Sequence, residues 1–425
     1  MIHRSLTAAV LSSCLMASPV LAQDGSPNEP DNSVTQEHEA FQAYNAGKYA
    51  QCAAAFEQAA RAGSAMEAAN SFYNAGCCHA LAGNINAAIA MLQRAIDAGY
   101  ANVINMAGDT DLANLRGDAR MDALLEQIAG AKIVITDNVK HDPDEAQFIY
   151  LDAENFVRAM ELVSAGADPV TTLEDEYFAR ATPGLKQMVV KYPFTAGDLA
   201  KAIQRYPEEY GRIAGNVALL RSRESDFRAA YRRYKQIAPD TVFAPTYFLV
   251  DRHRGIGSGS PDGQLISIES RTEESIGRME TLLIHELVHF QQLVATGPDE
   301  FYAIFGPKKT LLALTIREGT AEFFADYATG RMTQHDAVDY CLEHEHEIWH
   351  LFQDRMYERE TDGWMWSTPD DPSVPRDLAY VLGSRIVRTY YDRADDKRQA
   401  VREILAVTDY PAFIEKCRYG EQFDD

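Results

Sequence analysis

The pattern of small, apolar and polar residues along the chain changes near Asp144. Before it, Ala-rich segments alternate with Gly-containing turns, as in paired helices. After it, helical stretches run to Ile237 and are followed by two β-type runs, Val242–Val250 and Gln264–Glu269. An amphipathic segment from about Ser275 to Val294 then predicts a long helix. Helices, a small sheet and a further helix in this order predict an α+β fold that is predominantly helical.

The two β-type runs are separated by the segment RHRGIGSGSPDG, which contains four glycines. Glycine tolerates backbone conformations and close approaches that a side chain would forbid. We therefore interpret this segment as a flexible loop, or as backbone that lies very close to another part of the protein.

A sequence repeat with an offset of 36 residues occupies the first part of the chain. AGKY at Ala46–Tyr49 recurs as AGNI at Ala82–Ile85, and small residues recur where two helices would cross. This pattern resembles tetratricopeptide repeats, whose period is about 34 residues. It predicts tetratricopeptide-like helical repeats over residues 37–130, with a protein partner as their candidate ligand. An Ala-rich helical hairpin that only packs on its neighbour is the alternative.

The N-terminus has the features of a secretory signal peptide. An apolar run over Leu6–Leu21 follows a basic start and leads to Ala22, a small residue of the kind found at cleavage sites. We expect residues 1–22 to be removed and the polar segment 23–36 to be a disordered lead-in. A lipidated Cys14 is the alternative. The expected location is periplasmic or secreted, and no later run reaches the roughly 18 apolar residues that suggest a membrane span.

The formal charge of −23 disfavours nucleic acid as a partner, because an acidic surface repels phosphate backbones. Five cysteines follow the predicted signal peptide, and their odd number leaves at least one outside an intrachain disulfide. Since no two of them have C-x-x-C spacing, a cysteine zinc site is not expected. These cysteines are Cys52, Cys77, Cys78, Cys341 and Cys417.

The pattern HExxH occurs twice, as HELVH at His285–His289 and as HEIWH at His346–His350. Histidines four residues apart lie on one face of a helix and can bind one metal ion. Apolar residues flank the first copy and would keep water from the site, whereas the second lies in the charged stretch EHEHEIWH. We therefore favour the first copy. The second is interpreted as a solvated helix face on which Trp349 packs inward, with metal binding there, helped by His344, as the alternative.

A third zinc ligand is expected downstream, because zinc enzymes use three protein ligands and keep one position open. The segment REGTAEFFADY lies in a predicted helix over Thr310–Thr329. Glu318 in this segment follows His289 by 29 residues, and a Gly297-Pro298 turn between them lets the second helix return antiparallel to the first. Glu318 is therefore a candidate for the third ligand.

HELVH followed by EGTAEF resembles the gluzincin metallopeptidases, and most closely a bacterial family of predicted zinc-dependent proteases. Further stretches fit that family, so that the resemblance covers about residues 145–420. It implies a zincin-like metallopeptidase domain over residues 142–425, with a small sheet and an active helix that carries HExxH. The further stretches are YFARATPGLK, HEIWHLFQDRM followed by Trp364 and Trp366, and DLAYVLGSRIVRTYYDRADDKRQAVREIL.

The resemblance also implies one Zn²⁺ ion on His285, His289 and Glu318, with Glu286 as the general base toward a zinc-activated water. The chain is thus expected to be an exported zinc metallopeptidase that acts on peptide or protein substrates. One alternative is a repeat-based interaction protein whose zincin domain binds zinc but hydrolyses nothing, and the intact Glu286 argues against it. A zinc hydrolase that does not act on peptides is another.

Supporting roles are expected for three further residues and one strand. Glu322, one turn after Glu318, would hydrogen-bond a ligand imidazole, or is a surface acid. Tyr380 is the first candidate for a donor to the oxyanion of the tetrahedral intermediate, with a core aromatic as the alternative, and Arg385 is the second candidate. The strand near Gln264–Ile268 precedes the active helix. Zincins commonly have an edge strand at this place that binds an extended peptide through backbone hydrogen bonds, and we expect this strand to have that role.

Overall fold

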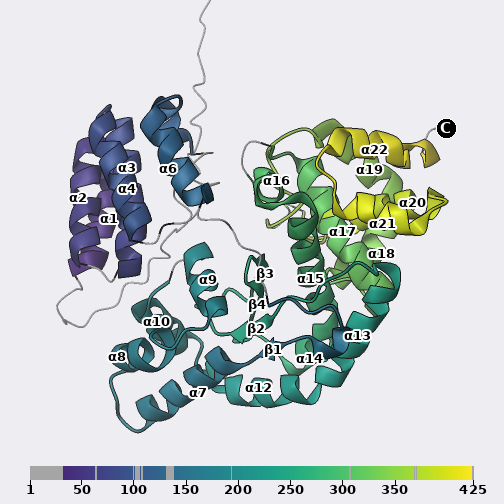
Figure 1. The fold of residues 1–425 in the computed structure, drawn as a ribbon, viewed down its shortest axis with the longest axis horizontal. Helices are drawn as coiled ribbons and strands as arrows, with labels where there is room; N and C mark the ends of the chain where they lie inside the picture. The colour runs from purple at the N-terminus through teal and green to yellow at the C-terminus, as the bar shows by residue number, and fades with distance from the viewer. Residues whose placement is uncertain are drawn as a thin grey trace, which may run out of the picture. The chain divides into compact units, whose positions relative to one another are not determined.

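The computed structural model describes residues 32–62, 65–98, 100, 106, 109–130, 138–192, 194–305, 308–367, 369 and 371–423. The predicted signal peptide, Cys14 and residues 23–31 of the predicted lead-in lie outside this part of the chain. The protein divides into two compact units (Figure 1). The first contains the helices up to residue 130, and the second contains the sheet and nearly all later helical residues. Within the described residues, no helix is long and apolar enough to cross a membrane.

The first four helices of the first unit pack in chain order as two hairpins. Their turns are alike, because Gly47 and Gly83 both have left-handed backbone, with φ of 68° and 79°. In each turn the next residue donates its N–H to a carbonyl five residues earlier, at 2.8 Å. The 36-residue sequence offset therefore corresponds to one turn geometry used twice. The elements are α1 (Asn32–Asn45), α2 (Tyr49–Ala62), α3 (Ala65–Leu81), α4 (Ile85–Asp97), η1 (Thr110–Leu115) and α6 (Ala119–Gly130).

Helix α1 begins at Asn32, so the predicted disordered lead-in extends five residues too far. The sequence NSVTQ has little apolar character, which led to the error. The first turn of a helix needs no apolar residue, because its N–H groups have no partner within the helix and water can satisfy them. The positions that dock this helix come later, as at the fully buried Ala40.

A disulfide between Cys52 and Cys78 joins α2 to α3, with the Cα atoms 5.9 Å apart. Phe56 and Ala75 belong to the same buried apolar cluster as this disulfide. The pairing could not be read from the sequence, because it depends on which helix faces meet. The other described cysteines, Cys77, Cys341 and Cys417, are buried thiols.

The second unit contains a four-stranded sheet with strand order β1-β2-β4-β3. β1 (Phe148–Ile149), β2 (Thr246–Leu249) and β4 (Gly263–Ser267) are parallel, and β3 (Gly257–Ser260) runs antiparallel to β4. The structure corrects two predictions. The Gly-rich segment contains strand β3 and is not simply a flexible loop. β4, the expected edge strand, lies between β2 and β3, and all five of its residues are buried.

The glycines of β3 allow this strand to lie very close to helix α15 (Met279–Thr296). A Cβ on Gly257 would lie 2.5 Å from Oε1 of Glu286, and one on Gly259 would lie 3.5 Å from Cβ of His289. The prediction of a close backbone approach is therefore confirmed at Gly257. Glycine in a strand has this use where another group must come near the backbone.

The other elements of the second unit are mostly helices, and the prediction of a predominantly helical α+β fold is confirmed. The predicted helices over 275–294 and 310–329 correspond to α15 and α17 (Leu311–Thr329). Before β2 the chain also forms η2 (Pro143–Glu145), α7 (Leu151–Ser164), α8 (Pro169–Leu173), η3 (Glu174–Phe178), α9 (Pro183–Lys191), α10 (Ala196–Arg205), α11 (Pro207–Gly211), α12 (Ile213–Ser222) and α13 (Glu224–Ile237). After β4 it forms α14 (Glu273–Ile276), α16 (Pro298–Ala303), η4 (His335–Ala337), α18 (Val338–Glu343), α19 (Glu345–Arg355), α20 (Leu378–Arg393), α21 (Lys397–Leu405), α22 (Tyr410–Cys417) and η5 (Tyr419–Gln422).

Helices α17 and α20 cross where their backbones touch (Figure 1). A Cβ on Gly383 would lie 2.0 Å from the carbonyl oxygen of Thr315, and a Cβ on Gly319 would lie 2.1 Å from the carbonyl carbon of Gly383. Both contacts are with backbone atoms, which cannot rotate away, so both positions require glycine. The crossing brings the turn of α20 that carries Tyr380 beside the turn of α17 that carries Glu318.

Gly383→Ala is expected to destabilise the second unit by about 1–3 kcal/mol, because the added methyl group forces the two helices apart. Urea unfolding followed by circular dichroism measures this change. Gly215→Ala on α12 is the matched control, since a Cβ there meets nothing within 4 Å. The control should be neutral or slightly stabilising. Equal stability of the two variants would contradict a tight crossing at Gly383.

Candidate metal centre

Helices α15 and α17 pack against each other in the second unit and carry the predicted ligands (Figure 1). His285, Glu286 and His289 are on α15, and Glu318 is on α17. All four residues are buried, with 5–9% of their surface exposed. Ionisable side chains are costly to bury unless they pair with one another or with an ion, so the cluster is a candidate functional site.

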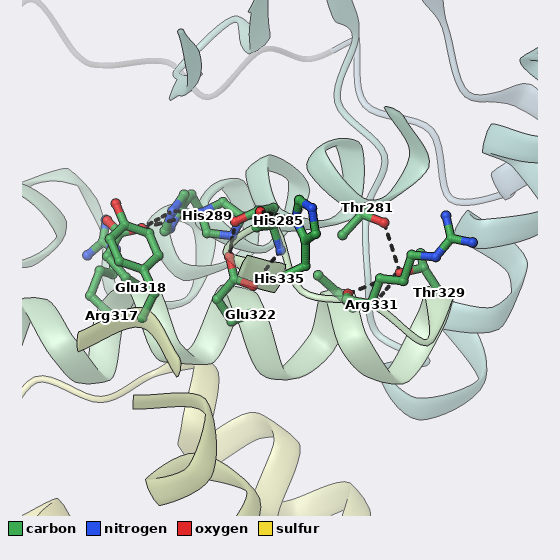
Figure 2. A network of polar contacts seen from close by, with 12 residues as sticks. Thr281, His285, His289, Arg317, Glu318, Glu322, Thr329, Arg331 and His335 are labelled. Carbon is green, nitrogen blue, oxygen red and sulfur yellow. Dashed lines mark hydrogen bonds and ion pairs between the residues drawn. The ribbon is translucent and has the colours of Figure 1, made fainter. Parts of the chain in front are cut away.

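Three side-chain atoms from these helices converge on one point (Figure 2). Nε2 of His285 lies 3.1 Å from Nε2 of His289. Oε2 of Glu318 lies 3.3 Å from the first of these nitrogens and 3.2 Å from the second. A tetrahedral ion with bonds of about 2.0–2.1 Å has ligands about 3.3 Å apart. The three atoms therefore have the spacing of one face of such a site, and these residues fit a single metal ion.

The other nitrogen of each imidazole is held by a further side chain. Nδ1 of His285 is 2.9 Å from Oε1 of Glu322, an ion-pair contact whose angle is not that of a good hydrogen bond. Glu322 is fully buried and accepts hydrogen bonds from the N–H of Thr333, at 2.7 Å, and from its hydroxyl. Nδ1 of His289 is 2.9 Å from Oε1 of Gln292. The structure therefore places Glu322 beside the imidazole of His285, a candidate ligand, and not at the surface.

The charges at the site shift the pKa values of its groups. Burial lowers the pKa of His285, but the carboxylates of Glu318 and Glu322 outweigh burial and raise this pKa well above its usual value. Burial raises the pKa of Glu318, but the imidazoles of His289 and His285 outweigh it and hold this pKa well below its usual value. Glu318 therefore carries a negative charge, and this charge favours the binding of a cation beside it.

Glu286 lies on the side of α15 that faces β3. Its carboxylate occupies the space that a side chain on Gly257 would fill. It is not one of the three converging groups. Glu286 is therefore next to His285 in the sequence but is not one of the three converging groups.

Tyr380 lies next to the ligands, with its ring centroid 6.1 Å from that of His285 and the planes 19° apart. Its hydroxyl oxygen accepts a hydrogen bond of 2.8 Å from Nε1–H of Trp366. An indole N–H can only donate, so the Tyr380 hydroxyl keeps its own proton for donation. Burial, and then the nearby carboxylate of Glu318, raise the pKa of Tyr380 well above its usual value and keep this proton in place.

Arg385, the second candidate on α20, is engaged elsewhere. Its Nε and Nη2 groups donate to the two carboxylate oxygens of Glu345, at 2.7 and 3.2 Å. Glu345 also accepts a hydrogen bond from the hydroxyl of Tyr419. This two-point ion pair holds α20 to α19, so we do not retain Arg385 as an oxyanion donor.

The second HExxH copy lies on α19. The Nε2 atoms of His346 and His350 are 3.3 Å apart, but both residues are exposed. Across the described ranges, no third His, Cys, Asp or Glu joins them in a set of three ligand atoms. Trp349 is buried and contacts the rings of Phe352 and Tyr419. The second copy therefore contributes Trp349 to the packing of α19. Its two histidines offer two possible ligand atoms, whereas the first site brings three together.

No protein-family model, curated protein or solved structure matches this chain. The resemblance to gluzincins therefore stays a prediction. In the structure, the HExxH helix and the EGTAEF helix bring side-chain atoms of His285, His289 and Glu318 together.

Four contributors to the site were not predicted from the sequence. Gln292 carried a signal, because it follows His289 by three residues and so lies on the same face of the helix. Gly257 carried a weaker one, in the Gly-rich segment. Trp366 carried one as well, because Trp364 and Trp366 after the HEIWHLFQDRM stretch fit the resembling family. Thr333 carried none, because it lies outside helices and strands, in a segment whose path depends on the rest of the fold.

Proposed function

We propose that this protein is a zinc-dependent metallopeptidase that hydrolyses peptide bonds. The observation that carries the proposal is the convergence of His285, His289 and Glu318, whose ligand atoms lie 3.1–3.3 Å apart. Two imidazoles and one carboxylate are a ligand set that zinc enzymes use, and three protein ligands leave a fourth position for water or substrate. Glu286 stands beside this set as the candidate base.

Each residue at the site has a role in the proposed reaction. Bound zinc would polarise the scissile carbonyl and lower the pKa of a water molecule. Glu286 would take a proton from that water and deliver it to the leaving amine. Tyr380 would donate a hydrogen bond to the oxygen that gains negative charge. Glu322 and Gln292 would hold the two imidazoles in the orientation that the ion requires.

Two features support a periplasmic or secreted location, which we include in the proposal. The apolar run over Leu6–Leu21 has the length and flanks of a signal peptide. The disulfide between Cys52 and Cys78 would persist in an oxidising compartment. We further propose that the hairpins α1–α4 are tetratricopeptide-like and bind a protein partner or substrate, since stacked helical hairpins present extended binding surfaces.

Metal removal tests the proposed function. The purified protein should hold about one zinc ion per chain by elemental analysis. It should also cleave members of a mixed peptide library, with the products identified by mass spectrometry. A chelator should abolish both, and added zinc should restore both. Bound zinc with no cleavage of any peptide would favour the non-hydrolytic alternative. Failure to bind supplied zinc would contradict the metal site itself.

A further inference from the structure

Two exposed aromatic rings stack on each other near the candidate metal centre. Phe305 follows α16, and Trp366 lies in the segment between α19 and α20. They are 45% and 48% exposed. Their ring centroids are 6.4 Å apart and their planes are 29° apart. Rings with this exposure keep apolar surface in contact with water, and a bound apolar group would remove that contact.

The pair is attached to the site through Tyr380. Trp366 donates its indole N–H to the Tyr380 hydroxyl, and the Tyr380 ring lies against the ring of His285. The aromatic pair is therefore one side chain away from a metal ligand. An extended peptide advances about 3.3 Å per residue, so a side chain within roughly three residues of the cleaved bond can reach these rings.

The backbone at Trp366 has an uncommon conformation. Trp366 and Asp377 have φ of 58° and 61°, and across the described residues only His253 and Arg418 are other non-glycine positions with positive φ. The N–H of Trp366 donates to Oδ1 of Asp377 at 2.6 Å. Left-handed backbone is unfavourable for a bulky residue, and such conformations concentrate at functional sites. The Trp366 ring is also about half exposed.

From these contacts we infer that Phe305 and Trp366 bind a large apolar side chain of the peptide substrate, close to the scissile bond. The inference rests on the proposed metallopeptidase function. Stacked aromatic rings offer apolar burial and dispersion contacts to Leu, Met or aromatic side chains, and very little to Ala or Gly. Both rings lie outside regular helices and strands, and such segments commonly carry the specificity of a site. Phe305 and Trp366 thus determine substrate specificity, whereas Glu286 and Tyr380 are the residues that act on the scissile bond.

Matched peptides test this inference. The peptides are identical except for Phe, Ala or Lys at one of the three positions on either side of the cleaved bond. The protein should prefer Phe over Ala at one of these positions, by kcat/KM. Phe305→Ala should reduce that preference about 3- to 10-fold, mainly by lowering kcat/KM for the Phe peptide. Leu351→Ala removes another exposed apolar side chain, 63% exposed on α19, and should keep the full preference.

A second variant separates recognition from chemistry. Trp366→Phe keeps an apolar ring but loses the N–H that holds the Tyr380 hydroxyl, so it should retain the preference and lower kcat for both peptides. Unchanged preference in Phe305→Ala, or a preference for Lys, would overturn the inference and leave the proposed function intact. If the zinc-loaded protein cleaves none of the peptides, the proposed function fails and the inference fails with it.

Discussion

Glu286→Gln is expected to keep about one zinc ion per chain while kcat/KM for peptides falls about 10²- to 10⁴-fold. Gln has the shape of Glu, so it fits the space that Gly257 leaves beside α15. It cannot accept and return a proton at neutral pH. Because Glu286 is not among the three converging ligand atoms, the metal should remain bound. Elemental analysis and peptide turnover on the same sample measure both effects.

Glu280→Gln is the matched control, because Glu280 lies on the same helix and pairs with Arg223 at 3.2 Å. It should keep both zinc and turnover. Gly257→Ala should give a milder form of the Glu286→Gln result, since the new methyl group pushes the carboxylate of Glu286 out of place. Full activity in Glu286→Gln would rule out Glu286 as the general base.

His285→Ala and His289→Ala are expected to lose zinc and, with it, peptide turnover. Two remaining protein ligands rarely hold a catalytic zinc ion. In His285→Ala, the buried carboxylate of Glu322 also loses the imidazole that lies 2.9 Å away. Zinc content is measured after dialysis against a weak chelator. Circular dichroism shows whether each variant is folded, so that loss of metal is separated from loss of structure.

His346→Ala and His350→Ala carry the same substitution in the second HExxH copy and serve as matched controls. Both histidines are exposed on α19, and neither belongs to a three-ligand group in the described part of the chain. Both variants should therefore keep zinc and turnover. Release of zinc by His346→Ala, with zinc retained by His285→Ala, would transfer the metal site to the second copy.

Features that depend on neighbouring residues were predictable from the sequence. Histidines four residues apart share a helix face wherever the helix packs, so His285 and His289 could be paired before any fold was known. Helix α17 begins after the N-cap Thr310 and ends at Thr329, before the left-handed C-cap Gly330. These limits are close to the predicted ones because helix caps depend on the local sequence. The repeated turn at Gly47 and Gly83 has the same local origin.

Features that depend on contacts between distant segments were not predictable. Tyr380 and Arg385 were both candidates for the oxyanion donor, and both lie on α20. The local sequence does not show which of them faces the site. The contact of Gly383 with Gly319 and Thr315 fixes how α20 lies on α17. In that arrangement Tyr380 lies beside His285, and Arg385 pairs with Glu345.

The sequence by itself determined which residues could bind a metal and on which helices they lie, because helical periodicity and capping act over a few residues. Only the tertiary structure decided that the two histidines of the first copy and Glu318 bring their ligand atoms within 3.1–3.3 Å of one another. It also decided that Gly257 makes room for Glu286 and that Trp366 reaches Tyr380. These contacts join segments far apart in the chain, and the packing of the whole unit sets them.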